Sequence, residues 1–280
     1  MIAIVVPTIR PKSYEGFIDT WMGWFDVHNV KVVTVWDGVH PMVCGKTIKE
    51  VMGKYSDLIY NFNDGVRNLG FAYVQRFLPE VDTIITMDDD VEPSGDTLND
   101  HLDALERFVP TSWLSTTSEY TRGFPYGVRT EAEVVLSHGV WEGVKDWDAP
   151  TQLVRGNPDV TFYKGVVPKG VLFPVCSMNL AFKRKMIPYM YQAPMGPKIG
   201  LDRFADIWGG IEAKKDIDRL GWAAVTGYAT VKHTRASNVF INLQKEVKGL
   251  AMNEEYGKGE YFKLFQEKRK RWKEFCGLYS

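Results

Sequence analysis

The stretch "VDTIITMDDDVEP", residues 81–93, contains the feature that decides the fold. An apolar run rich in β-branched residues ends abruptly in three consecutive aspartates, at positions 88–90. Such a run is typical of a strand that is covered on both faces of a sheet. Three adjacent carboxylates repel one another unless a positive group neutralises them. The rest of the chain therefore has to provide the other strands and a positive partner for the three carboxylates.

Strand and helix alternate through the first half of the chain. Apolar runs at residues 2–6, 31–38 and 57–62 predict further strands covered on both faces. Helices are predicted between them, one after Ser13 as an N-cap, one over residues 66–79, and one that carries the leucines at 98, 102 and 105. This alternation predicts an α/β fold with a Rossmann-like, mostly parallel central sheet and helices on both faces. Ligands bind beyond the carboxyl ends of the strands in such sheets.

The second half of the chain is less regular. Residues 137–154 are rich in glycine, aspartate and aromatic residues, which favours a binding loop over a core element. A helix is predicted around residues 204–211, and a strand that ends at His233. Apolar residues at helical spacing over residues 259–276 predict an amphipathic C-terminal helix.

Composition excludes several classes of protein. The chain has 280 residues, with 34 basic and 35 acidic side chains, so nothing indicates a general attraction to nucleic acid or to an anionic membrane. Three widely spaced cysteines argue against a disulfide framework and a structural zinc site. The N-terminal segment lacks a basic leader region, and no run of about 18 apolar residues occurs. We expect a cytoplasmic protein without a membrane partner.

The three aspartates are suited to a hard divalent cation. Mg²⁺ or Mn²⁺ takes one or two carboxylates together with oxygens of a substrate diphosphate. Because successive side chains of a strand point to opposite faces, we expect Asp88 and Asp90 on one side and Asp89 on the other. Asp90 is then predicted to bind the metal, Asp88 to contact a ribose or a metal-bound water, and Asp89 to lie behind the metal or contact a sugar. The alternative is an acidic turn that caps the next helix, although the preceding strand favours the metal.

Other polar residues follow the ends of the predicted strands. Arg10 and Arg67 are suited to clamp a diphosphate, and a solvated surface arginine fits the same pattern. Asp37 offers an acceptor for a uracil or ribose group, or else forms an ordinary Asp-Gly turn. His233 is suited to complete a metal shell as a neutral imidazole, and a structural histidine is the alternative.

Longer strings in the sequence resemble a known family. They occur in order from about residue 4 to residue 250 and are "VPTIR", "RNLGF", "MDDD", "SHGVW", "DWDAPTQLV", "PKGVLFPVCSMNLAF" and "RASNVFINLQKE". Together they resemble the reversibly glycosylated polypeptides, a family that includes the plant UDP-arabinopyranose mutases. The resemblance implies a GT-A-type glycosyltransferase fold, a UDP-sugar substrate and a Mn²⁺ or Mg²⁺ cofactor, with the aspartates at 88–90 as the metal and nucleotide motif.

The resemblance also implies roles for single residues. The family has a glycosylated arginine eight residues before the string that begins here at Ser137, which points to Arg129, although Tyr126-Gly127-Val128 replaces the family's Phe-Ser-Leu. The family has a pair of aspartates where this chain has Ala205-Asp206, so only Asp206 carries over. The predicted catalytic residues are Arg129 and Asp206. The predicted nucleotide contacts are Pro7, Thr8, Arg10, Asp37, Arg67, Asn68 and Asp88. The predicted sugar contacts are Asp89, Asp148, Gln152 and Trp208, and the predicted metal ligands are Asp90, Asp88 and His233.

The resemblance favours one function and leaves two alternatives. Residues 1–250 are predicted to form a single GT-A-like domain, with a nucleotide-binding half (1–110), a sugar or acceptor half (111–250), and a helical extension at 251–280. The leading hypothesis is a mutase that interconverts UDP-arabinopyranose and UDP-arabinofuranose. The alternatives are a glycosyltransferase that acts on an external glycan, protein or nucleobase, and a non-catalytic self-glycosylated carrier. The basic segment 268–273 either grips a polyanion or forms a solvated helix face, and a homo- or hetero-oligomer fits the resemblance.

Overall fold

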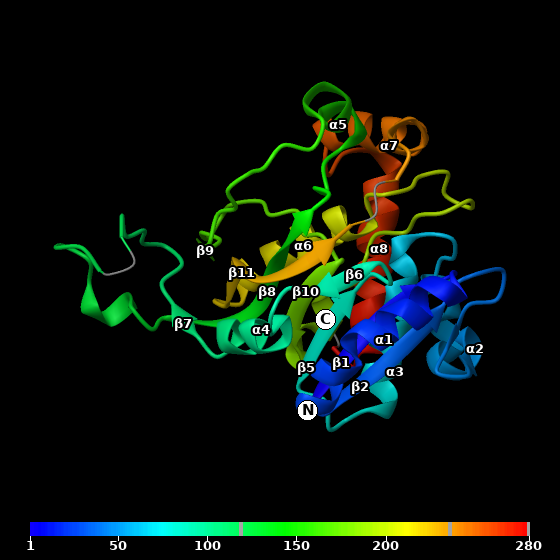
Figure 1. Ribbon diagram of the computed structural model, residues 1–280, viewed down its shortest axis with the longest axis horizontal. Helices are drawn as coiled ribbons and strands as arrows, with labels where there is room; N and C mark the ends of the chain where they lie inside the picture. The colour runs from blue at the N-terminus through cyan, green and yellow to red at the C-terminus, as the bar shows by residue number, and fades with distance from the viewer. Residues whose placement is uncertain (118–119, 235–236, 279–280) are drawn as a thin grey trace.

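The computed structural model describes residues 1–117, 120–234 and 237–278 as a layered α/β structure (Figure 1). Its strands are β1 (Ile2–Thr8), β2 (Val30–Trp36), β3 (Met42–Val43), β4 (Lys46–Thr47), β5 (Thr83–Met87), β6 (Val91–Pro93), β7 (Phe108–Val109), β8 (Ala132–Gly143), β9 (Gly165–Val166), β10 (Asn179–Lys183) and β11 (Ala223–His233). Its α-helices are α1 (Pro11–Val27), α2 (Ile48–Met52), α3 (Arg67–Phe77), α4 (Thr97–Leu105), α5 (Ala149–Arg155), α6 (Ala205–Arg219), α7 (Val239–Glu254) and α8 (Gly259–Phe275). Its 3₁₀ helices are η1 (Gly53–Leu58), η2 (Asp64–Val66), η3 (Tyr126–Val128) and η4 (Arg184–Tyr189).

The central sheet has the strand order β4-β3-β2-β1-β5-β10-β8-β11-β6. Strands β2, β1 and β5 pair in parallel, as do β8 and β11, and β10 joins the two groups by running antiparallel to both β5 and β8. The five strands β2, β1, β5, β8 and β11 therefore share one direction. Their carboxyl ends meet at one edge, which confirms the prediction of a mostly parallel central sheet.

Helices cover both faces of the sheet, as predicted. On one face, Trp21 of α1 and Leu98 of α4 pack against Ile4 and Ile85. On the other face, α3, α6 and α8 pack against the alternate residues of the same strands, such as Val5. Each large side chain buried in this way stabilises the fold by about 1.5–3 kcal/mol.

Several predicted elements differ from the structure. Residues 57–62 do not form a strand, because the hairpin β3–β4 takes the free edge of β2 and the apolar Leu58 and Ile59 are buried beside η1 in the core. Helix α1 begins at Pro11, not after Ser13, because proline is favoured at the first helical position. The predicted binding loop over residues 137–154 is largely the end of β8 followed by α5.

The C-terminal helix is part of the core. Phe262, Phe265 and Trp272 of α8 are buried, and the indole of Trp272 donates a hydrogen bond to the carbonyl of Ile187 at 2.8 Å. Helix α7 runs through the predicted boundary at residue 250. These two helices pack against the body of the fold, and the division into domains stays a prediction.

The basic segment of α8 is engaged within the chain. Lys268 and Arg271 pair with Asp57 of η1, while Arg269 and Lys273 pair with acidic residues of α6. These ion pairs do not support a grip on a polyanion. No helix among the described residues combines the length and the apolar run that crossing a bilayer requires.

Candidate functional site

The three aspartates form a turn immediately after β5. Strand β5 ends at Met87, yet Asp88 and Asp90 are partly exposed and Asp89 is buried, which fits the alternation expected for the three residues. Asp88 pairs with Arg67, while Asp89 and Asp90 both pair with Arg10. Two guanidinium groups thus face three carboxylates. The next helix, α4, is capped by a different residue, Asp96, so the alternative reading of the aspartates as its cap is wrong.

Asp89 lies beneath the site, which fits the predicted place behind the other aspartates and not the alternative of a sugar contact. It is 4% exposed, and its carboxylate accepts a hydrogen bond from the hydroxyl of Thr8 at 2.6 Å and further bonds from Arg10. Both Asp89 and Thr8 are therefore engaged within the protein. Their role is to position Arg10, which also donates to Asp90 at 3.0 Å.

Two of the predicted nucleotide contacts are buried in the first turn of α3. The Arg67 guanidinium donates to the hydroxyl of Thr86 at 2.9 Å, to the carbonyl of Asp64 and to the carboxylate of Asp88. Asn68 forms a two-way amide pair with the backbone of Gln192, at 2.9 and 3.1 Å. Each of the two residues is 2% exposed, so Asn68 is structural and Arg67 holds Asp88 in place.

Asp37 follows β2 at the same edge. One of its carboxylate oxygens accepts hydrogen bonds from the backbone N–H groups of Gly38 (2.7 Å) and Phe62 (3.0 Å), and burial raises its pKa. Phe62 is held in the left-handed region with φ 56°. Pro7, on the neighbouring strand β1, is half-buried. Contact of Asp37 and Pro7 with a nucleotide stays a prediction.

His233 lies next to the aspartates across the sheet. It ends β11 and pairs with Val91, the residue that follows Asp90. Its ring Nδ1 donates to the carbonyl of Val144 at 3.1 Å, which fixes the tautomer and leaves Nε2 as an acceptor. Among the described residues, no three His, Cys, Asp or Glu side chains already meet as a metal cluster. Asp88 and Asp90 already pair with Arg67 and Arg10, and their binding of a divalent ion together with His233 stays a prediction.

Asp206 carries the most perturbed carboxyl group of the site. It lies in the first turn of α6 and accepts a hydrogen bond from the backbone N–H of Ser177 at 2.8 Å. Its pKa is raised to about 7 by burial and by the negative charges of Asp64 and Asp146, against the lowering effects of the Ser177 hydrogen bond and of Arg67. A carboxyl group with such a pKa is partly protonated near neutral pH and is suited to proton transfer.

Three residues that were predicted to contact the sugar have other contacts, and the first two are Trp208 and Asp148. Trp208 is fully buried between Phe204 and Phe262, and its indole donates to the side chain of Asn253 at 2.9 Å, so neither ring face is open to a sugar. Asp148 is the N-cap of α5, and its two carboxylate oxygens accept from the backbone and the hydroxyl of Thr151. These bonds give both residues structural functions.

The third is Gln152, whose side chain closes the turn before α5. Its amide donates to the carbonyl of Trp147 at 2.5 Å, within the same loop. The acidic residue of this loop whose charge acts on Asp206 is Asp146, which is exposed and also lies near the half-buried Cys176.

Arg129 lies far from the aspartates. It precedes β8, whose other end, Gly143, pairs with His233. A strand of 12 residues is roughly 35 Å long, so Arg129 lies at the opposite edge of the sheet. Figure 1 shows the segment between β7 and β8 projecting from the body of the fold. There, the Arg129 guanidinium packs over the rings of Tyr120 and Tyr126, at 4.3 and 3.9 Å.

Sequence reasoning missed Asp64 and Arg203. Asp64 begins η2 beside Arg67, where its sequence context is that of an ordinary Asp-Gly turn. Arg203 precedes α6 and lies near Asp64 and Asp146, close enough for their charges to act on it. The helical pattern predicted from residue 204 places Arg203 close to Asp206 in the sequence. It gives no indication of the contacts that Arg203 makes in the fold.

Comparisons with known proteins agree with this arrangement of motifs. A family model described as "Reversibly glycosylated polypeptide" matches residues 1–267. A protein named "Probable UDP-arabinopyranose mutase 4" from Arabidopsis thaliana is 33% identical over 282 residues, which cover 90% of this chain and 75% of that protein. "UDP-arabinopyranose mutase 1" from Oryza sativa subsp. japonica is 32% identical over 285 residues, with 90% and 75% covered.

Among solved structures, a mutant β1,4-galactosyltransferase 7 from Drosophila, in complex with manganese, UDP-Gal and xylobiose, has a TM-score of 0.38 and 15% identity. The match covers 84% of this chain and 71% of that one, and its TM-score is too low to carry an argument. The match of the family model over nearly the whole chain is decisive: the chain belongs to the reversibly glycosylated polypeptide family.

Proposed function

We propose that this chain is a UDP-sugar mutase that interconverts UDP-arabinopyranose and UDP-arabinofuranose. Relatives with this activity in their names, at 33% identity over 90% of the chain, support the reaction. The observation that carries the assignment to a site is the pKa of Asp206, raised to about 7 on the same sheet edge as Asp88 and Asp90.

The reaction needs one group that can both take and give a proton. Bonds from C1 of the sugar to UDP and to the ring oxygen O5 break, a bond from C1 to O4 forms, and UDP returns to C1. The proton of the O4 hydroxyl is lost and O5 gains one, so the net proton change is zero. A carboxyl group with a pKa near neutrality suits both transfers. Asp206 is therefore our candidate for the acid and base.

The aspartates after β5 are proposed to hold the diphosphate end of the substrate. Asp88, Asp90 and His233 would bind a Mn²⁺ or Mg²⁺ ion, which supplies the positive charge that stabilises UDP as a leaving group. Arg10, anchored by Asp89, adds a fixed cation beside Asp90. Asp37 accepts a hydrogen bond from the nucleoside. Arg129 is left out of the catalytic set because it lies at the other edge of the sheet of its own chain.

Conversion of UDP-arabinopyranose tests this proposal. We expect chromatography to show UDP-arabinofuranose after incubation with Mn²⁺, and no product when EDTA is present. Asp206→Asn should slow conversion by about 10²–10⁴-fold while UDP still binds. Asp82→Asn, a matched change at an exposed residue that pairs with the N-terminus, should leave the rate unchanged. Transfer of the sugar to an added acceptor without any furanose product would contradict the proposal, and so would one stable protein adduct without turnover.

A further inference from the structure

Arg203 is held in a costly conformation by a buried partner. Its backbone is in the left-handed region with φ 66°, which is unfavourable for any residue with a Cβ. Its Nε donates to the carboxylate of Glu246 at 2.8 Å, and Glu246, on α7, is 3% exposed. Conformations of this kind persist only where the surrounding structure fixes them, and they are frequent at binding sites.

Glu246 links Arg203 to the loop on the other side of the site. Its second carboxylate oxygen accepts a hydrogen bond from the backbone N–H of Ala149 at 2.7 Å, at the start of α5. The loop that leads into α5 carries Asp146. One buried carboxylate thus sets the position of both the Arg203 guanidinium and the end of the Asp146 loop.

The bond to Glu246 leaves the outer nitrogens of Arg203 available. Among the described residues, neither Nη forms a hydrogen bond or an ion pair, and 31% of the side chain is exposed. By contrast, Arg67 and Arg10 use their outer nitrogens on the carboxylates after β5. Arg203 is thus the guanidinium of this sheet edge whose two outer nitrogens lack a protein partner in the described part of the chain.

The charges around Arg203 decide which ligand it suits. Burial alone would lower its pKa, but the carboxylates of Glu246, Asp64 and Asp146 outweigh that effect and raise it. Three carboxylates around one guanidinium oppose the approach of a phosphate group. A sugar hydroxyl is neutral and both donates and accepts hydrogen bonds, so it can accept from Arg203 while it donates to Asp64 or Asp146.

We propose that Arg203 is a sugar-binding residue, which donates from its outer nitrogens to pentose hydroxyl oxygens while Asp64 and Asp146 accept from the hydroxyls. This inference rests on the proposed function, because it places the sugar of a UDP-sugar between Arg203 and Asp206. Glu246 is a positioning residue that aims the guanidinium. Arg203 therefore sets the affinity for the sugar part of the substrate and not the affinity for UDP.

Calorimetric titration of UDP and of UDP-arabinopyranose, each with Mn²⁺, separates the two parts of the ligand. Arg203→Gln should weaken binding of UDP-arabinopyranose by about 10- to 100-fold, as expected for lost hydrogen bonds from a charged donor, and leave the Kd of UDP unchanged. Arg219→Gln, at the exposed far end of α6, is the matched control and should change neither affinity. Equal weakening of both ligands would overturn the proposal in favour of a phosphate contact, and unchanged binding of both would overturn it outright.

Two further variants separate binding from folding. Arg203→Gly and Arg203→Gln both remove the cation of Glu246, but the φ at this position suits glycine, so Arg203→Gly should melt at a higher temperature than Arg203→Gln and still lose the sugar-specific affinity. Glu246→Gln should weaken only UDP-arabinopyranose, less than Arg203→Gln does. If the wild-type chain binds UDP but gains no affinity from any attached sugar, the proposed function fails and the inference fails with it. If the wild type gains affinity from the sugar and Arg203→Gly keeps that gain, the inference alone fails.

Discussion

The pKa values of the acidic residues are shifted in opposite directions at the two ends of helix α6. At its start, Asp206 has its pKa raised to about 7, first by burial and then by the charges of other acidic residues. Two and three turns later on the same helix, burial alone would likewise raise the pKa values of Glu212 and Asp216, yet both are lowered. The difference lies in the cations that the chain supplies at each end.

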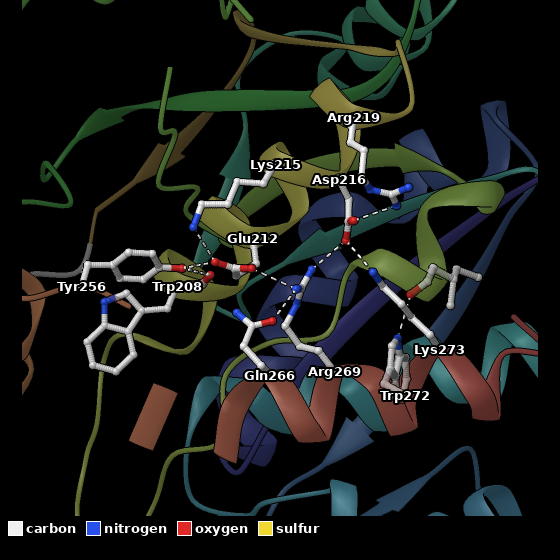
Figure 2. A network of polar contacts seen from close by, with 11 residues as sticks. Trp208, Glu212, Lys215, Asp216, Arg219, Tyr256, Gln266, Arg269, Trp272 and Lys273 are labelled. Atoms are coloured by element: carbon white, nitrogen blue, oxygen red, sulfur yellow. Dashed lines mark hydrogen bonds and ion pairs between the residues drawn. The ribbon is translucent and has the colours of Figure 1, made fainter. Parts of the chain in front are cut away.

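The second region is a network of ion pairs and hydrogen bonds between α6 and α8, which we call the latch (Figure 2). Arg269 of α8 donates to Glu212 at 2.9 Å and to Asp216 at 2.8 Å and is 6% exposed. Glu212 also accepts hydrogen bonds from Lys215 and Tyr256. Asp216 also accepts from Arg219 and Lys273. Every carboxylate in the latch therefore has a cation, which suits a structural role. At the start of α6 the acidic residues outnumber their partners, which suits a site that binds a neutral sugar and moves protons.

The largest effect is expected from Asp206→Asn. The amide keeps an acceptor for the N–H of Ser177 but cannot take up or release a proton. We expect the rate of furanose formation to fall by about 10²–10⁴-fold, the range of general acid–base catalysis, with the Kd of UDP nearly unchanged. The rate is measured by chromatography at saturating substrate. A rate within a few-fold of the wild type would show that Asp206, at the start of α6, does not act as the acid and base.

Arg269→Met should have a large effect on stability. It leaves Glu212 and Asp216 with fewer cations in a buried setting, and breaking such a pair costs about 3 kcal/mol of the free energy of unfolding. Urea denaturation measures this loss. Lys263→Gln on the same helix is the matched control, because its partner Glu260 is exposed, and it should change stability by about 0.5 kcal/mol or less. Similar losses of unfolding free energy in the two variants would show that the buried ion pairs of the latch contribute no more than an exposed pair.

The pH dependence of stability should differ in sign between the two regions. Asp206 has a raised pKa, so between about pH 4 and pH 7 the native state binds a proton that the unfolded chain lacks. The contribution of Asp206 to the free energy of unfolding therefore rises as the pH falls through 7. Asp206→Asn should therefore be more stable than the wild type at pH 8, by about 1–3 kcal/mol, and this advantage should shrink as the pH falls below 7 and be lost at about pH 4. Glu212 and Asp216 have lowered pKa values, so their contribution is present above about pH 4.5 and is lost at lower pH.

This comparison needs unfolding curves of wild type, Asp206→Asn and Arg269→Met at several pH values. The deficit of Arg269→Met should be full at pH 7 and shrink below pH 4. An advantage of Asp206→Asn that does not change between pH 5 and pH 8 would contradict the raised pKa.

The smallest effect is expected at Asp57. Its side chain is 48% exposed and pairs with Lys268 at 2.6 Å and with Arg271, which together lower its pKa. Solvent screens such pairs, so Asp57→Asn should cost about 1 kcal/mol or less of the free energy of unfolding. Thermal or urea unfolding in low and high salt checks this, since the cost should shrink with added salt. A loss as large as that of Arg269→Met would show that exposure does not separate the pairs of α8.

Much of the first half of the fold follows from the sequence, because strands buried on both faces leave continuous apolar runs. The failure at residues 57–62 has the same origin, since a short apolar run is equally typical of a segment buried outside the sheet. Helix α8 was predicted from its spacing, but the pairing of Arg269 with α6, 53 and 57 residues away, leaves no local signal.

The candidate site was predicted in outline and not in its contacts. The aspartates after β5 and the strand end at His233 stand out in the sequence, whereas Asp206 was predicted only from the family resemblance. Burial decides the rest: Asp89, Asn68 and Trp208 carry suitable chemical groups, yet their partners lie within the protein. The bond that positions Arg203 joins residues 43 apart in the sequence, so only the fold reveals it.

The most direct test of this account is a measurement of the carboxyl pKa values of α6 by ¹³C NMR, with Asp206 assigned from the Asp206→Asn variant. We predict that the Asp206 signal titrates near pH 7, while the signals of Glu212 and Asp216 titrate below their ordinary range. An Asp206 signal that titrates below pH 4, together with those of the latch, would contradict the claim that the unpaired end of α6 is the site of the chemistry.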